Sequence, residues 1–135
     1  KEWPQDKLQE AFEHVLPTVP SDLLSKELWC TSTSPVDWFQ KQRAFTISVA
    51  VMSVVGYVLG LGDRHLGNIL ADFRTGEIVH IDYNICFDRG LRLPVPEVVP
   101  FRLTKTIVEA FGITGVHGTF TQSCERVLSV LRQHT

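Results

Sequence analysis

The sequence predicts an α+β domain that is predominantly helical, with one small β-hairpin near its middle. Apolar residues recur at helical spacing over most of the chain, whereas residues 68–82 consist of a short apolar run, a turn and a β-branched run. The 135 residues, of which 44% are hydrophobic, can bury a core of their own. The formal net charge of −2 argues against a basic surface, so no direct nucleic-acid contact is expected.

Two helices are expected first. Residues 4–16 place apolar side chains at helical spacing, between Pro4, which suits a first turn, and Pro17, which stops a helix. Residues 21–29 predict a second, shorter helix with Ser21 as its N-cap. A polar break follows, so the next helix begins independently.

A long helix is expected from Pro35 to Leu59. Ser34 is predicted as its N-cap, followed by proline at the first position and Asp37 at the third. The second half is apolar on all sides, which favours a place in the middle of the domain. Residues 44–62 carry no charge and approach the length that spans a bilayer, so a membrane segment is the alternative. Hydroxyl side chains in this run, and the acid directly after it, favour the buried helix.

A hairpin and a proline-rich loop come next. Residues 68–82 predict a β-hairpin with its turn near Gly76. Residues 91–101 contain three prolines, spaced so that neither a helix nor a central strand can form. An extended, ordered loop is therefore expected over those residues.

Two further helices are expected toward the end of the sequence. Residues 103–111 predict a helix that Gly112 ends. The last helix is predicted to open with Thr119 and Gln122 in capping-box spacing. Its apolar face is expected to consist of Phe120, Cys124, Val127, Leu128 and Leu131.

The chemistry is concentrated in "GLGDRHLGNIL", residues 60–70. Asp63, His65 and Asn68 lie in the loop after the long helix, and Asp82 ends the second hairpin strand. Hairpin pairing brings Asn68 and Asp82 close together. Two carboxylates in a poorly hydrated cleft require a positive partner, and carboxylate and amide oxygens suit Mg²⁺. The sequence therefore predicts that Asn68 and Asp82 bind a metal ion together with a nucleotide's phosphates.

The spacing of these residues indicates a kinase. Protein kinases carry H-R-D-x-x-x-x-N followed by D-F-G, and Asp63 and Asn68 have the same offset of five positions. Asp82-Tyr83-Asn84 stands where D-F-G would be, but the histidine follows the first aspartate by two positions. This order, "GDRHLGN" and then "HIDYN", resembles the phosphatidylinositol-3-kinase-related protein kinases and their lipid-kinase relatives. "AVMSVVGYVLGLGDRH", "VPEVVPFRLT" and "GITGVHGTF" extend the resemblance over essentially the whole chain.

The resemblance implies a fold and a set of roles. Residues 1–135 would form the C-terminal lobe of a PI3/PI4-kinase catalytic domain, with ATP and Mg²⁺ or Mn²⁺ as cofactors. Asp63 would orient or deprotonate the acceptor hydroxyl, and His65 would contact the transferred phosphoryl group. Which of these two residues takes the proton is left open. Asn68 and Asp82 would bind the metal ion and the nucleotide.

The lobe that covers the nucleotide is expected before Lys1, because the sequence contains no G-x-G-x-x-G loop. We therefore expect negligible activity from these residues alone. The remainder of the same kinase chain is the first expected partner.

The resemblance also predicts an activation segment. Tyr83 is expected to pack beneath the metal site, and Asn84 to replace a glycine whose φ is positive. Arg64 is expected to pair with an acid of this segment or to face solvent. The residues assigned to the segment are Tyr83, Asn84, Arg89, Arg92, Pro100, Phe101 and Arg102.

The acceptor is expected to be a protein. Between residues 83 and 100, two arginines are balanced by two acids, whereas a phosphoinositide headgroup calls for a strongly basic loop. Within the family, "DRHLGN" and "HIDYNICF" are most similar to the kinase of nonsense-mediated mRNA decay. That similarity implies Ser/Thr-Gln sites in an RNA helicase of the decay pathway. A phosphoinositide lipid kinase and a pseudokinase scaffold lobe are the alternatives.

The cysteines indicate the compartment. The three cysteines form no C-x-x-C pair and are odd in number, which favours reduced thiols. A cytosolic or nuclear protein that does not contact a membrane is therefore expected.

Overall fold

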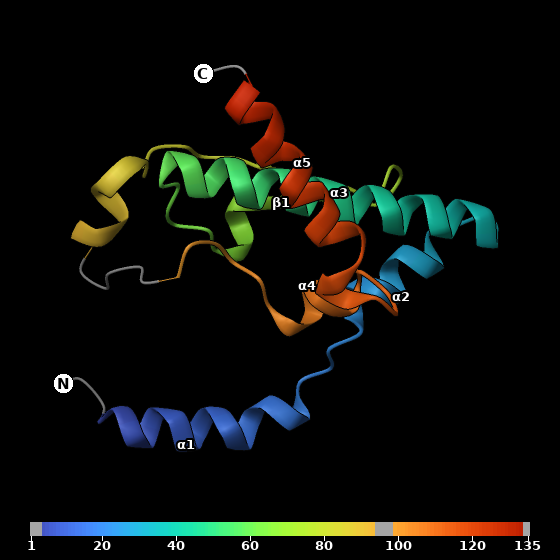
Figure 1. Ribbon diagram of the computed structural model, residues 1–135. Helices are drawn as coiled ribbons and strands as arrows, with labels where there is room; N and C mark the ends of the chain where they lie inside the picture. Colours follow the sequence, from blue (N-terminus) through green and yellow to red (C-terminus); the bar gives the residue numbers. More distant parts are fainter. Residues whose placement is uncertain (1–3, 94–98, 134–135) are drawn as a thin grey trace.

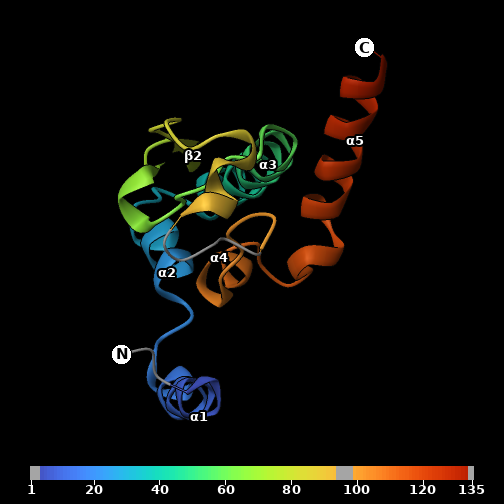
Figure 2. The same ribbon diagram turned by 90° about the vertical axis from the view of Figure 1, so that its left-hand side faces the viewer.

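The fold is organised around one long helix, α3 (Pro35–Leu59). The computed structural model describes residues 4–93 and 99–133. A two-stranded sheet lies on one side of α3, and α5 (Thr119–Gln133) crosses its other side (Figures 1 and 2). The remaining helical segments are α1 (Gln5–Val15), η1 (Leu16–Thr18), α2 (Leu23–Cys30), η2 (Leu66–Asn68), η3 (Phe87–Arg92), α4 (Lys105–Glu109) and η4 (Gly115–His117), where η denotes a 3₁₀ helix.

The ends of α3 follow from its sequence. The Ser34 hydroxyl accepts a hydrogen bond from the Asp37 N–H at 3.1 Å, and the Asp37 carboxylate accepts one from the Thr33 N–H at 2.8 Å. At the other end, Gly60 has φ +59°, a left-handed conformation that glycine adopts without steric cost. The predicted helix, its N-cap and its proline at the first position are all confirmed.

An aromatic cluster fills the core between α3, α4 and α5. The Phe111 ring stacks on Phe120, with centroids 4.9 Å apart, and lies 6.2 Å from Phe45 on α3. The buried core residues are Leu28, Phe45, Val49, Ala50, Ile78, Ala110, Phe111 and Phe120. Half of these residues belong to α3 and β2, and three lie between positions 110 and 120, so the aromatic cluster joins the C-terminal part of the chain to the long central helix.

The hairpin packs against α3 through both its backbone and its turn. Strands β1 (Ile69–Asp72) and β2 (Glu77–His80) pair antiparallel, with Ile69 opposite His80. The Ile78 N–H donates to the Ser48 hydroxyl of α3 at 3.0 Å. A Cβ atom at Gly76 would lie 2.3 Å from the Lys41 carbonyl oxygen, so only glycine fits this turn. The predicted hairpin and turn are confirmed.

Two predicted helix starts are wrong by one position. Asp22, not Ser21, is the N-cap of α2, and its carboxylate pairs with Lys26 at 2.7 Å instead of capping the helix. Thr119 is already the first helical residue of α5. Neighbouring polar residues compete for a cap, and only the path of the chain before the helix selects between them.

The proline-rich segment and the helix after it also differ from expectation. Leu91 and Arg92 belong to η3 and are helical, not extended, because the prolines that break the helix begin only at residue 94. Residues 94–98 lie outside the described part of the chain. The next helix is shorter than the predicted 103–111, because Thr104 caps it: its hydroxyl accepts from the Ile107 N–H.

α1 stands apart from the rest of the fold (Figures 1 and 2). The predicted helix is present, but its apolar stripe stays exposed, with Phe12 62% accessible. By contrast, Phe45 and Val49 on α3 are 2% accessible. α3 is long and apolar enough to cross a membrane by length and composition, yet 44% of that stretch is buried in the fold, as expected for a core helix.

Candidate active site

The candidate loop begins where α3 ends. The Gly62 N–H donates to the Ile85 carbonyl at 2.9 Å, which joins the loop to the segment after β2. A Cβ atom at Gly60 would lie 2.4 Å from the Phe87 carbonyl oxygen. The loop "GLGDRHLGN" and the start of the predicted activation segment are therefore in direct backbone contact.

The two candidate acids share an uncommon backbone conformation. Asp63 has φ +58° and Asp82 has φ +57°, both in the left-handed region. Such a conformation costs a non-glycine residue about 1–2 kcal/mol, so the surrounding structure must impose it. Asn84 does not need the tolerance of asparagine for positive φ, because the left-handed residue at the end of β2 is Asp82, two positions earlier.

Asn68 connects the two acids. It is 6% accessible, and its side-chain amide donates to the Asp63 carbonyl at 2.9 Å. Its own carbonyl accepts from the Ile81 N–H at 3.0 Å, next to Asp82. Because the amide nitrogen is used inside the loop, the amide oxygen is the atom that could bind a cation. The expected proximity of Asn68 and Asp82 is confirmed at the level of the backbone.

Arg64 lies inside the site, which the sequence reasoning missed. It is 8% accessible and donates four hydrogen bonds, to the carbonyls of Gly62, Asn68, Ile81 and Asp82. The expected exposure to solvent is wrong, and the four bonds end on main-chain oxygens. One signal could have revealed this: the arginine stands between a buried helix and a strand, where carbonyl groups of a tight loop need donors.

His65 is oriented by the glycine that follows it. Its Nδ1 accepts from the Gly67 N–H at 3.0 Å, so the neutral ring carries its proton on Nε2. Nε2 lies 4.0 Å from an Asp63 carboxylate oxygen, close enough for electrostatic attraction but too far for a direct hydrogen bond. A Cβ atom at Gly67 would approach the His65 ring to 2.9 Å, so a larger residue there would displace the imidazole.

A cavity of about 270 Å³ adjoins the two candidate catalytic residues. It brings the loop together with the end of the predicted activation segment. Its lining residues are Leu61, Asp63, Arg64, His65, Val99, Pro100, Phe101 and Arg102. The Nε atom of Arg102 is buried and has no hydrogen-bond partner in the described part of the chain.

The start of the predicted activation segment, residues 83–92, does not line this cavity. The Arg89 guanidinium donates to the Asn84 carbonyl at 3.1 Å, so it holds its own segment together. Tyr83 is 47% accessible among the described residues, and its expected packing beneath the metal site stays a prediction.

The oxygen donors fit a magnesium ion that also binds phosphates. The Asp82 carboxylate accepts from the Asn84 N–H at 3.2 Å, which orients it without neutralising its charge. Among the described residues, no group of three or more His, Cys, Asp or Glu side chains could enclose a metal. One carboxylate and one amide match the open half-shell with which proteins bind Mg²⁺ through substrate phosphates.

His80 is buried beside the charged site. It is 8% accessible on β2, and its Nδ1 has no hydrogen-bond partner within the described residues. Burial lowers the pKa of His80, and the Arg64 guanidinium lowers it further. A neutral ring therefore faces Arg64, and the site avoids a second buried positive charge.

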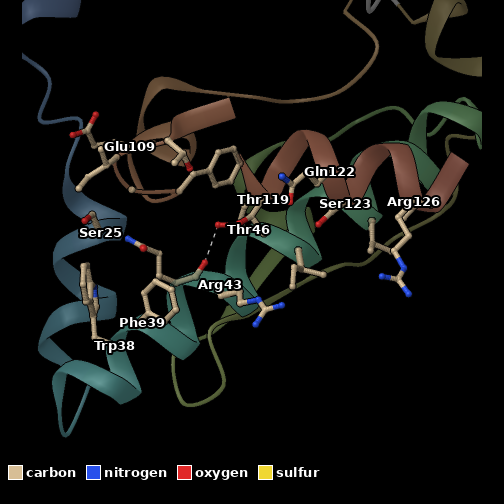
Figure 3. Close-up of a pocket in the computed structure, with 18 residues that line it drawn as sticks. Ser25, Trp38, Phe39, Arg43, Thr46, Glu109, Thr119, Gln122, Ser123 and Arg126 are labelled. Atoms are coloured by element: carbon tan, nitrogen blue, oxygen red, sulfur yellow. Dashed lines mark hydrogen bonds between the residues drawn. The ribbon is translucent and has the colours of Figure 1, made fainter. Parts of the chain in front are cut away.

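A larger cavity of about 1290 Å³ lies between α3 and α5 (Figure 3). Trp38 and Phe39 border it at one end, and Arg126 lies at the other. None of the candidate catalytic or metal-binding residues lines it. The larger cavity is therefore separate from the candidate chemistry.

Comparison with solved structures first identifies the class of fold. The chain resembles "FAT and kinase domain of CtTel1" with a TM-score of 0.80 and 47% identity, over 83% of this chain and 8% of that one. It also matches "Structure of the open conformation of CtTel1" with the same TM-score of 0.80. The helices and hairpin described above are thus those of a kinase domain, and the predicted fold class is confirmed.

The family follows from the sequence matches. Residues 2–135 match the family described as "Phosphatidylinositol 3- and 4-kinase", and the chain belongs to it. A serine/threonine-protein kinase SMG1 of Danio rerio is 49% identical over 98% of this chain, and a Drosophila melanogaster Smg1 is 48% identical over the same share. The kinase TEL1 of Saccharomyces cerevisiae is 61% identical over 73% of the chain. The chain spans 4% of the length of each of these three relatives.

Proposed function

We propose that this chain forms the metal-binding and acceptor-facing part of an ATP-dependent serine/threonine protein kinase. The observation that carries the proposal is the position of Asn68. Its side-chain amide donates a hydrogen bond to the Asp63 carbonyl, and its own carbonyl accepts one from the N–H of Ile81, the residue before Asp82. An acceptor-facing acid and two hard oxygen ligands thus meet at one place. The relatives, which are named serine/threonine-protein kinases, support the same activity.

Asn68 and Asp82 hold the cation in this proposal. These two residues would hold Mg²⁺, or Mn²⁺ in its place, which would supply positive charge opposite the phosphate oxygens of ATP. The chain's own contribution is to present an amide oxygen and a carboxylate from two segments tied together by the hairpin. Positioning of this kind supplies most of the acceleration in phosphoryl transfer.

Asp63 is the base in this proposal. The acceptor hydroxyl gives its proton to the Asp63 carboxylate, its oxygen bonds to the γ-phosphorus, and the bond to the ADP oxygen breaks. His65 cannot take that proton readily: Nδ1 already accepts from Gly67, and Nε2 carries a hydrogen. His65 instead donates its Nε2–H to the phosphoryl oxygens, where negative charge must be stabilised.

A protein hydroxyl is the proposed acceptor. Of the two arginines between residues 83 and 100, Arg89 is bonded to its own segment, which weakens the case for a headgroup-binding loop. The resemblance to the nonsense-mediated mRNA decay kinase supports Ser/Thr-Gln sites, an RNA helicase as substrate, and action in the cytosol or nucleus. Residues 1–135 serve as a C-terminal lobe that works only with the nucleotide-covering lobe of the same kinase.

Phosphate transfer by the intact kinase tests the activity. Asp82→Asn is the informative variant, because asparagine tolerates positive φ but contributes no charge. Asp72→Asn is its matched control, since Asp72 lies on the same hairpin and pairs with Arg74 at an exposed turn. We expect transfer to a Ser-Gln peptide to be lost in the first variant and kept in the second. Equal rates in wild type and Asp82→Asn would support a pseudokinase scaffold.

The acceptor class is tested with the same enzyme. We expect a Ser-Gln peptide to be phosphorylated faster than a Ser-Ala peptide, and phosphatidylinositol vesicles to receive no phosphate. Labelled lipid in place of labelled peptide would establish the lipid-kinase alternative. In cells that carry only the Asp82→Asn kinase, transcripts with premature stop codons are expected to persist; unchanged decay would place the kinase in another branch of the family.

A further inference from the structure

The Arg64 side chain donates hydrogen bonds to both segments of the candidate site, the loop after α3 and the residues that follow β2. Nε donates to the Gly62 carbonyl at 2.7 Å, before Asp63. Nη1 donates to the Ile81 carbonyl at 2.7 Å, and Nη2 to the Asp82 carbonyl at 2.5 Å. One planar group therefore spans the loop after α3 and the end of β2.

These contacts control the backbone at the two strained acids. The Gly62 carbonyl belongs to the peptide unit before Asp63, and the Ile81 carbonyl to the unit before Asp82. The φ angle of a residue sets how the preceding peptide unit is turned relative to the side chain of that residue. The hydrogen bonds from Arg64 to these two carbonyls therefore restrain φ of both acids in the left-handed region. The bond from Nη2 to Asp82 fixes the following peptide as well.

We propose that Arg64 is a positioning residue that sets the distance between the acceptor-facing acid and the cation ligands. It acts through the backbone carbonyls to which it donates hydrogen bonds. The inference rests on the proposed phosphotransferase function. A guanidinium is required because its donors lie in a rigid plane and point in several directions, whereas a lysine ammonium is a single point charge on a flexible stem.

The burial of the Arg64 side chain supports its role as a positioning residue. Arg64 is 8% accessible, so its charge is largely removed from water, and the four carbonyl dipoles replace that solvation. A side chain required only for packing could be apolar; the charge is used here to align four carbonyl groups from two segments.

The test compares two arginine-to-lysine variants of the intact kinase. Arg64→Lys keeps the charge but loses the planar set of donors. Arg74→Lys is the matched control, because Arg74 is 90% accessible and pairs with Asp72 at 3.2 Å on the hairpin turn. We expect kcat to fall about 100-fold in Arg64→Lys, the loss typical of a misplacement near 1 Å. The Mg²⁺ concentration for half-maximal rate is expected to rise several-fold, and Arg74→Lys to match wild type.

Two readouts separate positioning from folding. Hydrogen exchange without nucleotide is expected to increase in residues 62–68 and 81–84 of Arg64→Lys, while exchange in α3 stays unchanged. In Arg64→Ala, millimolar guanidinium ion is expected to restore part of the lost rate, whereas ammonium at equal ionic strength does not. Rates are taken per nucleotide-binding molecule, so that unfolded protein does not count.

Several outcomes would overturn the proposal. Wild-type kcat and Mg²⁺ dependence in Arg64→Lys would do so, as would a lower rate explained entirely by a smaller folded fraction. If neither Arg64 variant folds, Arg64 is a folding residue and the proposal is wrong. If the wild-type kinase transfers no phosphate, or if Asp82→Asn leaves its rate unchanged, the proposed function is refuted instead. Failure of the Arg64 proposal and failure of the proposed function therefore give different results.

Discussion

The two ends of α3 are held by different interactions. Toward its N-terminus, Phe45 packs into an aromatic cluster with Phe111 and Phe120, and the contacts are apolar and buried. Beyond its C-terminus, main-chain hydrogen bonds and the Arg64 guanidinium hold the loop. Apolar packing has little directional preference, whereas hydrogen bonds depend on angle. The aromatic end therefore contributes stability, and the loop end contributes position.

The largest expected effect is on the rate, at the loop end. Asp63→Asn removes the proposed base but keeps the side-chain shape and tolerates φ +58°. We expect kcat of the intact kinase to fall by about 10²–10⁴-fold, the range for loss of general base catalysis. Thermal unfolding should be unchanged. A rate within twofold of wild type would mean that another residue takes the proton.

The next effect is on stability, at the aromatic end. Phe111→Ala removes a ring that is 5% accessible and is expected to cost about 3–5 kcal/mol. Hydrogen exchange of α3 amides in the intact kinase measures this loss, while kcat per folded molecule should stay unchanged. Phe39→Ala, at a 59% accessible ring on the same helix, is the control and should change stability by about 0.5 kcal/mol or less. A selective loss of kcat in Phe111→Ala would show that the two ends are coupled.

Gly60 lies at the boundary between α3 and the candidate loop. Gly60→Ala puts a Cβ atom 2.4 Å from the Phe87 carbonyl oxygen, at φ +59°. We expect a loss of about 1–3 kcal/mol from the strained backbone, together with a lower kcat because the activation segment must shift. Gly115→Ala is the control: φ is +49° there, but the nearest atom, on Val108, is 3.9 Å away. Equal kinetics in both variants would show that the clash with Phe87 is unimportant.

The smallest expected effect is a pH dependence at His80. Its pKa is lowered in the folded state by burial and by Arg64, so the unfolded chain binds the proton more readily. Stability is then constant above about pH 6.5, the ordinary histidine pKa, and falls as the pH drops from there toward the lowered value. His80→Gln should flatten this slope in hydrogen exchange of β2, whereas His117→Gln, at an exposed position, should keep it. An unchanged slope in His80→Gln would assign the dependence to another group.

The sequence predicted the elements whose signals are local. The start of α3 follows from Ser34, Pro35 and Asp37, which act within one helical turn. The hairpin follows from a short apolar run before Gly76 and a β-branched run after it. The limits of α2 and α4 were less predictable, because several polar residues could cap each helix. The exposure of the α1 stripe was not predictable at all, since amphipathic spacing does not say what covers the apolar face.

The order and spacing of Asp63, His65, Asn68 and Asp82 resemble those of one kinase family, and that resemblance was enough to predict the family. Only the tertiary structure revealed that Arg64 is buried and binds carbonyls of two segments, and that the backbone is left-handed at both acids. The four carbonyls that Arg64 binds come from residues up to 18 positions away, and no local pattern encodes their convergence. Residue types at set spacings were therefore enough to predict the candidate site, whereas its geometry depended on how two separate segments pack around one buried charge.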